Sequence, residues 1–413
     1  MTTISESAPA VATDEPTAGE LIQRAKDLIP LLIENQDRTE QATRCSPEVH
    51  EAIRAAGLYR TLIPRRYGGY EQDITTFTEI VKQLARGCPS TAWGFCLAAR
   101  HVVQAATIFP EHVQDQVLSA EFRAAEVAAP TLRIRKVEGG WSLTGTAQFA
   151  SGIPYSTYYM GQALPVESED GPPVGPPSLF IAPPGTWEMV DDWGWTLGLR
   201  GSGSNSIKFD GAVIPDDYVV PNTLAIDFPV GQGMPGLRLH DNPIYTGRTV
   251  GPITLDMAAL MTGMALGALD EYETLLATKR TMRPPQIIRA EDPDYQRLYG
   301  RAFSKLFAAE ALIRQGGEHH QQACRDQADG SQAQFTRETD AQNGLLGGGM
   351  VGASRSKSEQ FSTTDATGKT SSRSSSQQVQ GGLKADGTAS MEEDPLRWRV
   401  EGATLITVEI GRA

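Results

Sequence analysis

The sequence predicts an α+β protein made of an N-terminal helical domain, a central β-barrel or β-sandwich and a C-terminal helical bundle. Apolar residues recur at helical spacing up to about residue 120, then alternate with polar residues to about 220, and return to helical spacing after about 250. Between a leader over 1–17 and a low-complexity tail over 343–413, the expected domains cover residues 18–120, 121–222 and 223–342. A chain of 413 residues can hold several domains with sizeable cores.

The first domain is expected to consist of helices. Apolar positions from Leu21 to Leu32 predict one helix over residues 18–43. A second helix begins at Ser46-Pro47, because serine caps a helix N-terminus and proline suits the first turn. Further helices are expected over residues 73–86, 89–109 and 111–119.

The second domain is expected to be built from short strands. Leu132, Ile134 and Val137 alternate with polar residues, and Val137-Glu-Gly-Gly-Trp141 is typical of a tight hairpin. A loop rich in Pro and Gly follows at 166–177. Further strands are expected near residues 158–164, 178–182, 187–190, 206–209 and 212–214.

The third domain contains two long predicted helices, over residues 254–279 and 292–327, which need partners and therefore indicate a bundle. Leu255 to Leu269 is the most apolar stretch, and we expect it to form a core helix too short to span a bilayer. From Asn343 to Ser390 the chain is mostly small and polar, which predicts disorder and leaves the bundle incomplete.

Charge and cysteine usage limit the classes of function. The net charge of −13 argues against unassisted binding to nucleic acid or anionic membranes. The four cysteines form no CxxC pair, so a reduced cytoplasmic setting is expected. The leader lacks the features of a signal peptide and is expected to be disordered. His319, His320 and Cys324 have metal-ligand spacing but no evident fourth ligand; we expect a solvent-exposed helix face and no metal.

Three residues near the junction of the first two domains could carry chemistry. His101 follows Trp93 by eight residues, just over two helical turns, so both can face the same side. A neutral imidazole there could exchange a proton, and the alternative is a core histidine bonded to a backbone carbonyl. Ser151, in Phe149-Ala-Ser-Gly152, could bond a ligand nitrogen beside a flat ring, and the alternative is an ordinary strand end.

The loop that starts at Trp193 is rich in glycine and hydroxyl groups, in the order Trp-Gly-Trp-Thr-Leu-Gly-Leu-Arg-Gly-Ser-Gly-Ser-Asn-Ser. Its backbone N–H groups could meet an anion or a substrate, and the alternative is a plain glycine-rich connection. The sequence contains neither a phosphate-binding GKS/GKT loop nor the strand–GxGxxG–helix order of dinucleotide sites.

The order of helices, strands and helices resembles the acyl-CoA dehydrogenase fold, and local motifs narrow the resemblance over residues 18–340. It is closest to the flavin-dependent monooxygenases of two-component systems, a branch with para-hydroxyphenylacetate hydroxylase oxygenase, secosteroid hydroxylase and dibenzothiophene monooxygenase. The motifs are Cys88-Pro-Ser-Thr-Ala-Trp followed by His101, Glu138-Gly-Gly-Trp-Ser-Leu-Thr-Gly, Phe149-Ala-Ser-Gly, and Leu197-Gly-Leu-Arg-Gly-Ser-Gly-Ser-Asn-Ser.

The resemblance implies a cytoplasmic homotetramer that takes reduced FMN or FAD from a separate flavin reductase. It implies hydroxylation of a phenolic or other aromatic or heteroatom substrate with oxygen, through a flavin C4a-hydroperoxide. Carried over by position, Trp93 lines the flavin or substrate pocket, His101 assists deprotonation of the substrate and Ser151 lies near flavin N5. Arg280, or Lys279 beside it, is the candidate for the flavin phosphate.

The chain also departs from the family. After about Gln342 nothing matches the last helices or their late active-site histidine, which predicts weak flavin binding. An acyl-CoA dehydrogenase-type oxidoreductase is the first alternative, but it needs a carboxylate base, and the candidates considered in the late chain, Glu392 and Glu393, lie outside any helical pattern. The second alternative is a non-catalytic assembly subunit.

Overall fold

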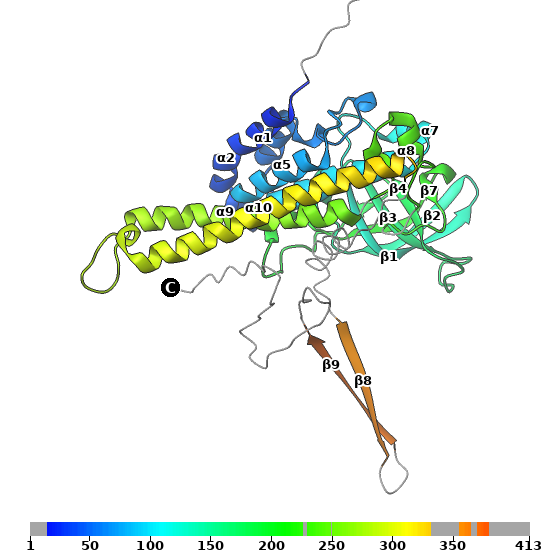
Figure 1. Ribbon diagram of the computed structural model, residues 1–413. Helices are drawn as coiled ribbons and strands as arrows, with labels where there is room; N and C mark the ends of the chain where they lie inside the picture. Colours follow the sequence, from blue (N-terminus) through cyan, green and yellow to red (C-terminus); the bar gives the residue numbers. More distant parts are fainter. Residues whose placement is uncertain (1–14, 226–228, 249, 332–354, 365–369, 380–413) are drawn as a thin grey trace, which may run out of the picture.

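The structure is a computed structural model, and it describes residues 15–225, 229–248, 250–331, 355–364 and 370–379. Helices on one side meet a β-sheet on the other (Figure 1). The helices are α1 Ala18–Asp27, α2 Ile29–Glu34, α3 Gln36–Gln41, α4 Pro47–Ala55, α5 Ile74–Gly87, α6 Pro89–Ile108, α7 Glu111–Val117, α8 Pro235–His240, α9 Val250–Thr278 and α10 Pro293–Ala328. The strands are β1 Ala124–Val137, β2 Gly140–Ala147, β3 Tyr158–Pro165, β4 Ser178–Ala182, β5 Glu188–Met189, β6 Ile207–Ile214, β7 Val219–Val220, β8 Arg355–Thr364 and β9 Thr370–Val379.

The N-terminal helices begin at capping residues. Ser46 accepts a hydrogen bond from the Val49 backbone at the start of α4, as its position predicts. The single helix predicted over residues 18–43 is wrong, because the structure has α1, α2 and α3 there. Pro30 lies in the first turn of α2, and it lacks the N–H that a continuous helix would need at that point.

The β domain is a seven-stranded mixed sheet in the order β5-β6-β2-β1-β3-β4-β7. The predicted hairpin is confirmed, since β1 pairs with β2 antiparallel, while β1 and β3 are parallel. The two strands predicted at 206–209 and 212–214 are one strand, β6. A register shift opposite Leu143 and Thr144 interrupts its pairing, and Gly211 there takes a left-handed φ of 78°.

The long helices α9 and α10 pack along α5. At Gly263 and Gly267 an added Cβ would lie only 2.2 Å and 2.5 Å from carbonyl oxygens of α5, so glycine permits the close approach of α9. Two ion pairs fix the arrangement: Arg86 with Asp270 on α9, and Lys82 with Glu310 on α10.

Helix α9 is longer than the sequence predicts. Among the described residues, the 28 from Gly251 to Thr278 are by length and composition apolar enough to cross a membrane, so the expectation that the apolar stretch is too short to do so is wrong. In the most apolar window of this helix 56% of the residues are buried within the protein, which accounts for its composition as that of a core helix.

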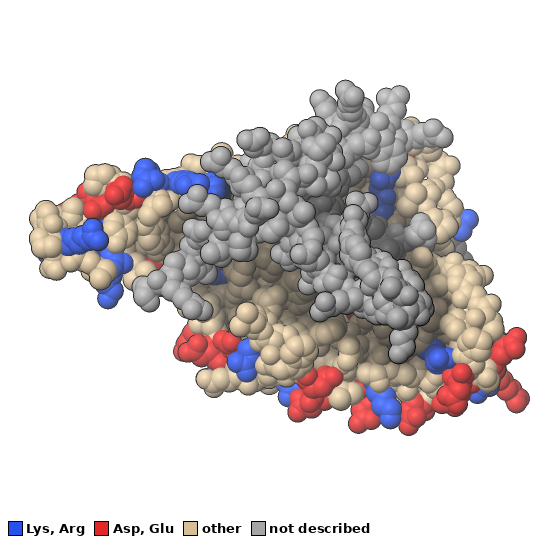
Figure 2. Space-filling view, turned by 90° about the horizontal axis from the view of Figure 1, so that it is seen from below, with Lys and Arg blue, Asp and Glu red and all other residues tan. Residues whose placement is uncertain are grey.

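The structure describes a two-stranded antiparallel hairpin, β8 and β9, inside the 343–413 tail for which the sequence predicts disorder. The rest of that tail lies outside the described residues. On the face shown in Figure 2, acidic and basic side chains are interspersed along the edges of the described part.

Helix α6 lies between the other helices and the sheet, and two consecutive residues tie it to both. The Arg100 guanidinium donates to the Asp256 carboxylate of α9 at 2.8 Å, and the Asp256 side chain is fully buried. His101 contacts β1 instead, because consecutive helical residues point about 100° apart. This buried pair therefore orients the helix that faces the sheet.

The Asp256→Asn variant tests the buried pair. It leaves the buried Arg100 charge uncompensated, so the free energy of unfolding is expected to fall by about 3–5 kcal/mol. The control is Glu111→Gln, which breaks an exposed pair with Arg66 and is expected to cost under about 1 kcal/mol. Urea unfolding of the full chain measures both, and equal losses would contradict the assignment.

Candidate active site

Trp93 and Ser151 meet at the junction between α6 and the sheet. The indole Nε1 of Trp93 donates to the Ser151 hydroxyl at 2.9 Å. Phe149, two residues before Ser151, has a φ of 64°, so the chain turns sharply just after β2 and presents Ser151 to α6. The structure thus brings together two residues that the sequence singles out.

Two further hydroxyl groups extend this pair. Ser204 lies 2.8 Å from Ser151, and Ser202 lies 2.7 Å from Ser204, measured between hydroxyl oxygens; all three residues are buried. Both come from the glycine-rich loop that the sequence analysis singles out, although it assigns no role to either serine. A row of hydroxyl groups that both donate and accept suits the polar edge of a ligand.

The space beside the serines is small. A cavity lined by Gly94, Gly152 and Ser202, among others, has a volume of about 20 Å³, room for about one water molecule. A flavin ring therefore does not fit inside this cavity. The adjoining surface is more open, because Phe149 is 54% exposed, Trp195 is 74% exposed and Leu197 is fully exposed.

The exposed apolar side chains belong to one local arrangement. The rings of Trp193 and Phe149 meet edge to face, with centroids 6.1 Å apart. The loop that carries Trp195 and Leu197 therefore lies against Phe149, two residues before Ser151. Exposed aromatic and aliphatic groups beside a polar edge are the features that bind a flat heteroaromatic ring. The residues present therefore fit a flavin.

His101, like Trp93, reaches from α6 to the β domain, but its surroundings differ. Its ring is buried, with Nδ1 2.8 Å from the Ala124 carbonyl oxygen and Nε2 3.3 Å from a Glu126 carboxyl oxygen. Burial and the neighbouring Arg100 charge lower its pKa to about 3, so the imidazole is neutral at physiological pH. The carbonyl contact is the one expected of a core histidine.

Glu126 is the residue of this site that the sequence analysis misses. Its carboxyl group is buried on β1 and accepts a hydrogen bond from the Gln104 amide at 3.2 Å. Burial raises the pKa of Glu126 to about 7. A lone carboxylate in the apolar run from Ala124 to Pro130 was the signal available in the sequence.

Arg280 is not brought to the other predicted residues. It lies in the connection between α9 and α10, at the end of that pair away from the sheet (Figure 1). Its guanidinium donates to the Gln286 carbonyl within the same connection, at 2.8 Å. Lys279 lies in the same connection. Within one chain, neither can contact a ligand held by Ser151.

The expectation of a solvent-exposed face at His320 and Cys324 is wrong. Cys324 is buried, with its sulfur 3.4 Å from His320 Nε2, because α10 packs there against the start of α9 near Gly251. Among the described residues, no group of three His, Cys, Asp or Glu side chains could hold a metal ion. Glu392 and Glu393, the carboxylates of the dehydrogenase alternative, lie outside the described residues.

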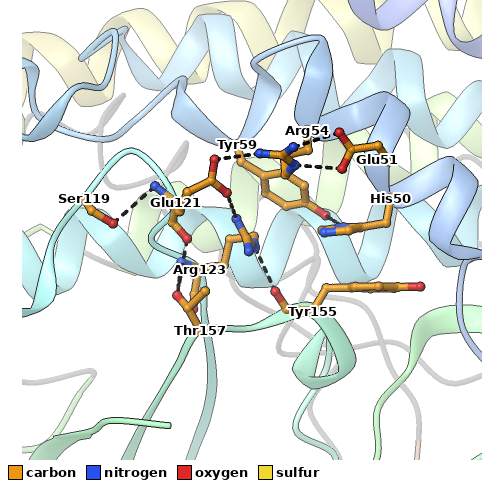
Figure 3. Close-up of polar contacts among 9 residues, drawn as sticks. All are labelled: His50, Glu51, Arg54, Tyr59, Ser119, Glu121, Arg123, Tyr155 and Thr157. Carbon is orange, nitrogen blue, oxygen red and sulfur yellow. Dashed lines mark hydrogen bonds and ion pairs between the residues drawn. The ribbon is translucent and has the colours of Figure 1, made fainter.

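A polar network joins the helical domain to the sheet near Ser151 (Figure 3). Arg123 donates to the Tyr155 carbonyl and to the Glu121 carboxylate, and Glu121 also accepts from Arg54 of α4. The Tyr155 ring stacks on His50 of α4, with centroids 3.9 Å apart. These contacts fix the short segment that carries Ser151 against the helices.

The comparisons with known proteins concern the fold and the class of protein. The family model described as "Acyl-CoA dehydrogenase, N-terminal domain" matches residues 22–116. The relatives and structural neighbours are oxygenase components of flavin-dependent monooxygenases with the acyl-CoA dehydrogenase-like fold, so the predicted resemblance and fold class are confirmed.

Particular relatives include the pigment production hydroxylase of Rhodococcus sp. (strain ATCC 21145), 27% identical over 72% of this chain and 75% of that protein. The HsaA oxygenase subunit of Rhodococcus jostii is 29% identical over 61% of this chain and 64% of that protein. The p-hydroxyphenylacetate 3-hydroxylase oxygenase component of Acinetobacter baumannii is 27% identical over 49% of this chain and 48% of that protein. The chain thus spans between about half and three quarters of these relatives.

Solved structures show the same fold. The HsaA monooxygenase from M. tuberculosis superposes with a TM-score of 0.68 at 23% identity, over 80% of this chain and 82% of that one. XiaF from Streptomyces sp., solved with FADH2 and glycerol, gives a TM-score of 0.68 at 22% identity, over 81% of each chain.

Proposed function

We propose that this chain is the oxygenase component of a two-component flavin monooxygenase that hydroxylates an aromatic, most simply phenolic, substrate. A separate reductase supplies the reduced FMN or FAD. The observation that carries the proposal is the Trp93–Ser151 hydrogen bond at the α6–sheet junction, beside the exposed Phe149, Trp195 and Leu197. Its relatives named as flavin-dependent hydroxylases support it.

Each part of the site has a physical task in this proposal. Ser151, whose hydroxyl is held by the Trp93 indole N–H, bonds the polar edge of the ring, while Phe149, Trp195 and Leu197 cover its faces and keep water away. When bound, the reduced flavin supplies the oxygen chemistry. His101 handles the proton of the substrate hydroxyl, and its neutral state at physiological pH leaves it able to accept one.

The position of Arg280 bears on assembly. Because its connection lies away from the sheet of its own chain, Arg280 can serve a flavin phosphate only in a neighbouring subunit, with Lys279 as the nearby substitute. The proposed assembly is therefore the homotetramer that the resemblance implies, acting in the cytoplasm.

His101→Ala tests the proton role. Hydroxylated product is expected to fall by about 10²–10⁴-fold, the usual contribution of a general base, while the reduced flavin is still oxidised by oxygen. Product and hydrogen peroxide are measured together with a phenol and a flavin reductase. The control is His112→Ala, an exposed histidine paired with Asp217, expected to change neither. Equal loss of flavin oxidation and product in His101→Ala would contradict the role.

Flavin affinity and assembly test the cofactor site. Ser151→Ala is expected to weaken FMN binding about tenfold, because one hydrogen bond of about 1–1.5 kcal/mol is lost. Ser142→Ala, a hydroxyl on β2 that bonds Gly211, is the control and is expected to bind as the wild type does. Calorimetric titration measures affinity, and sedimentation measures assembly. Since the sequence after about Gln342 does not match the family's late helices, wild-type binding is expected to be weak, and tight binding would contradict that.

A further inference from the structure

Both ring nitrogens of His101 are engaged, and the contacts determine its tautomer. Nδ1 lies 2.8 Å from the backbone carbonyl oxygen of Ala124. A carbonyl oxygen can only accept a hydrogen bond, so Nδ1 must carry the hydrogen. In a neutral imidazole only one nitrogen is protonated, which leaves a lone pair on Nε2.

That lone pair faces a carboxyl group. Nε2 lies 3.3 Å from Oε2 of Glu126, while Oε1 of the same carboxyl accepts from the Gln104 amide. Two lone pairs that face each other in a buried site repel, so the contact is favourable only with one proton between Nε2 and Oε2. Because Oε1 already accepts the hydrogen bond from Gln104, Oε2 is the carboxyl oxygen that can carry the shared proton.

We propose that Glu126 and His101 form one buried proton-sharing unit, in which Glu126 is the positioning residue that holds His101 in its Nδ1–H tautomer and stores the proton that lies between Nε2 and Oε2. This inference rests on the proposed function for its role in the reaction, although the pairing itself stands on the contacts alone.

The surroundings set where the proton resides. Other charged or titratable groups near the pair are Arg100, whose charge is balanced by Asp256, and Tyr159 on β3. Gln104 also lines a cavity of about 10 Å³ with Arg100, Arg248 and His320. Burial raises the pKa of Glu126 to about 7 and lowers that of His101 to about 3. Below about pH 7 the proton is therefore on Glu126.

In the reaction, the substrate hydroxyl gives its proton to the Glu126–His101 pair, and the pair carries no net charge afterwards. The unit starts as a Glu126 carboxylate beside a neutral His101. The substrate O–H bond breaks as its proton enters the gap between Nε2 and Oε2, and an O–H bond forms at Oε2 of Glu126 beside Nε2. The phenolate and a neutral carboxyl–imidazole pair remain. Without Glu126 the same proton would leave a buried imidazolium, which burial opposes.

Nitrogen-15 histidine NMR on the full, flavin-free chain tests the pairing, with His101→Gln identifying the signals. His101 is expected to stay neutral with hydrogen on Nδ1 from about pH 5 to about pH 9. Its Nε2 resonance is expected to shift once, near pH 7, and Glu126→Gln should remove that shift. Hydrogen on Nε2, or the same shift in Glu126→Gln, would overturn the proposal.

A stability measurement gives a second readout of the wild type and covers the case in which Glu126→Gln does not fold. The raised pKa means that the folded chain keeps a proton that the unfolded chain releases above about 4.5. The resulting stabilisation is complete below about pH 4.5 and is lost as pH rises through about 7. Glu126→Asp keeps a carboxyl group, so its free energy of unfolding should still fall as pH rises through about 7. The control is Glu138→Gln, which removes an exposed carboxylate at the β1–β2 turn and should leave this pH dependence as in the wild type. A Glu126 carbon-13 carboxyl resonance that titrates near 4.5 in the wild type would refute the pairing.

Kinetics separate this inference from the proposed function. With a hydroxylated phenol, Glu126→Gln is expected to lower kcat about a hundredfold with little change in KM, and to remove the pH dependence near 7, whereas Glu126→Asp should partly restore both. An unchanged pH profile in Glu126→Gln would overturn the relay while leaving the oxygenase assignment intact. Absence of any hydroxylation by the wild type would sink the oxygenase assignment, and the NMR result would still decide the pairing.

Discussion

The architecture depends on the opposite attachment of two consecutive residues of α6. Arg100 is bonded to a buried carboxylate of α9, and His101 is bonded to β1. A helix with only one such attachment could rotate about its axis, whereas α6 is fixed on both sides. Because Trp93 lies on the same helix, its indole reaches Ser151 only while this orientation is kept.

This constraint explains why the chemistry gathers at one boundary. The helical domain contributes an indole, an imidazole and an amide, while the sheet contributes hydroxyl groups and the Glu126 carboxyl. Neither domain holds a site by itself. The Arg123 and Tyr155 network on the other side of the junction keeps the two domains in register, so the polar edge at Ser151 and the proton-sharing pair at His101 hold a fixed separation.

The sequence predicts most of the fold, because helical and strand periodicities follow local burial. It also singles out Trp93, His101 and Ser151, because they lie in short motifs. It misses Glu126 and Ser204, whose importance comes from contacts between segments distant in the chain. The sequence also predicts a single helix over residues 18–43, where Pro30 interrupts the helix. It predicts that Cys324 is exposed to solvent, whereas packing of α10 against α9 buries it. Packing between elements decides these details, and no single segment encodes it.

The proposed site requires that a flavin ring lie against the surface formed by Phe149 and Trp195, with its polar edge at Ser151 and Trp93. A crystal structure of the full chain soaked with FMN tests this most directly. The account predicts ring density within hydrogen-bonding distance of the Ser151 hydroxyl. An ordered flavin bound elsewhere on the chain, with the Ser151 hydroxyl still bonded only to Trp93 and Ser204, would contradict it.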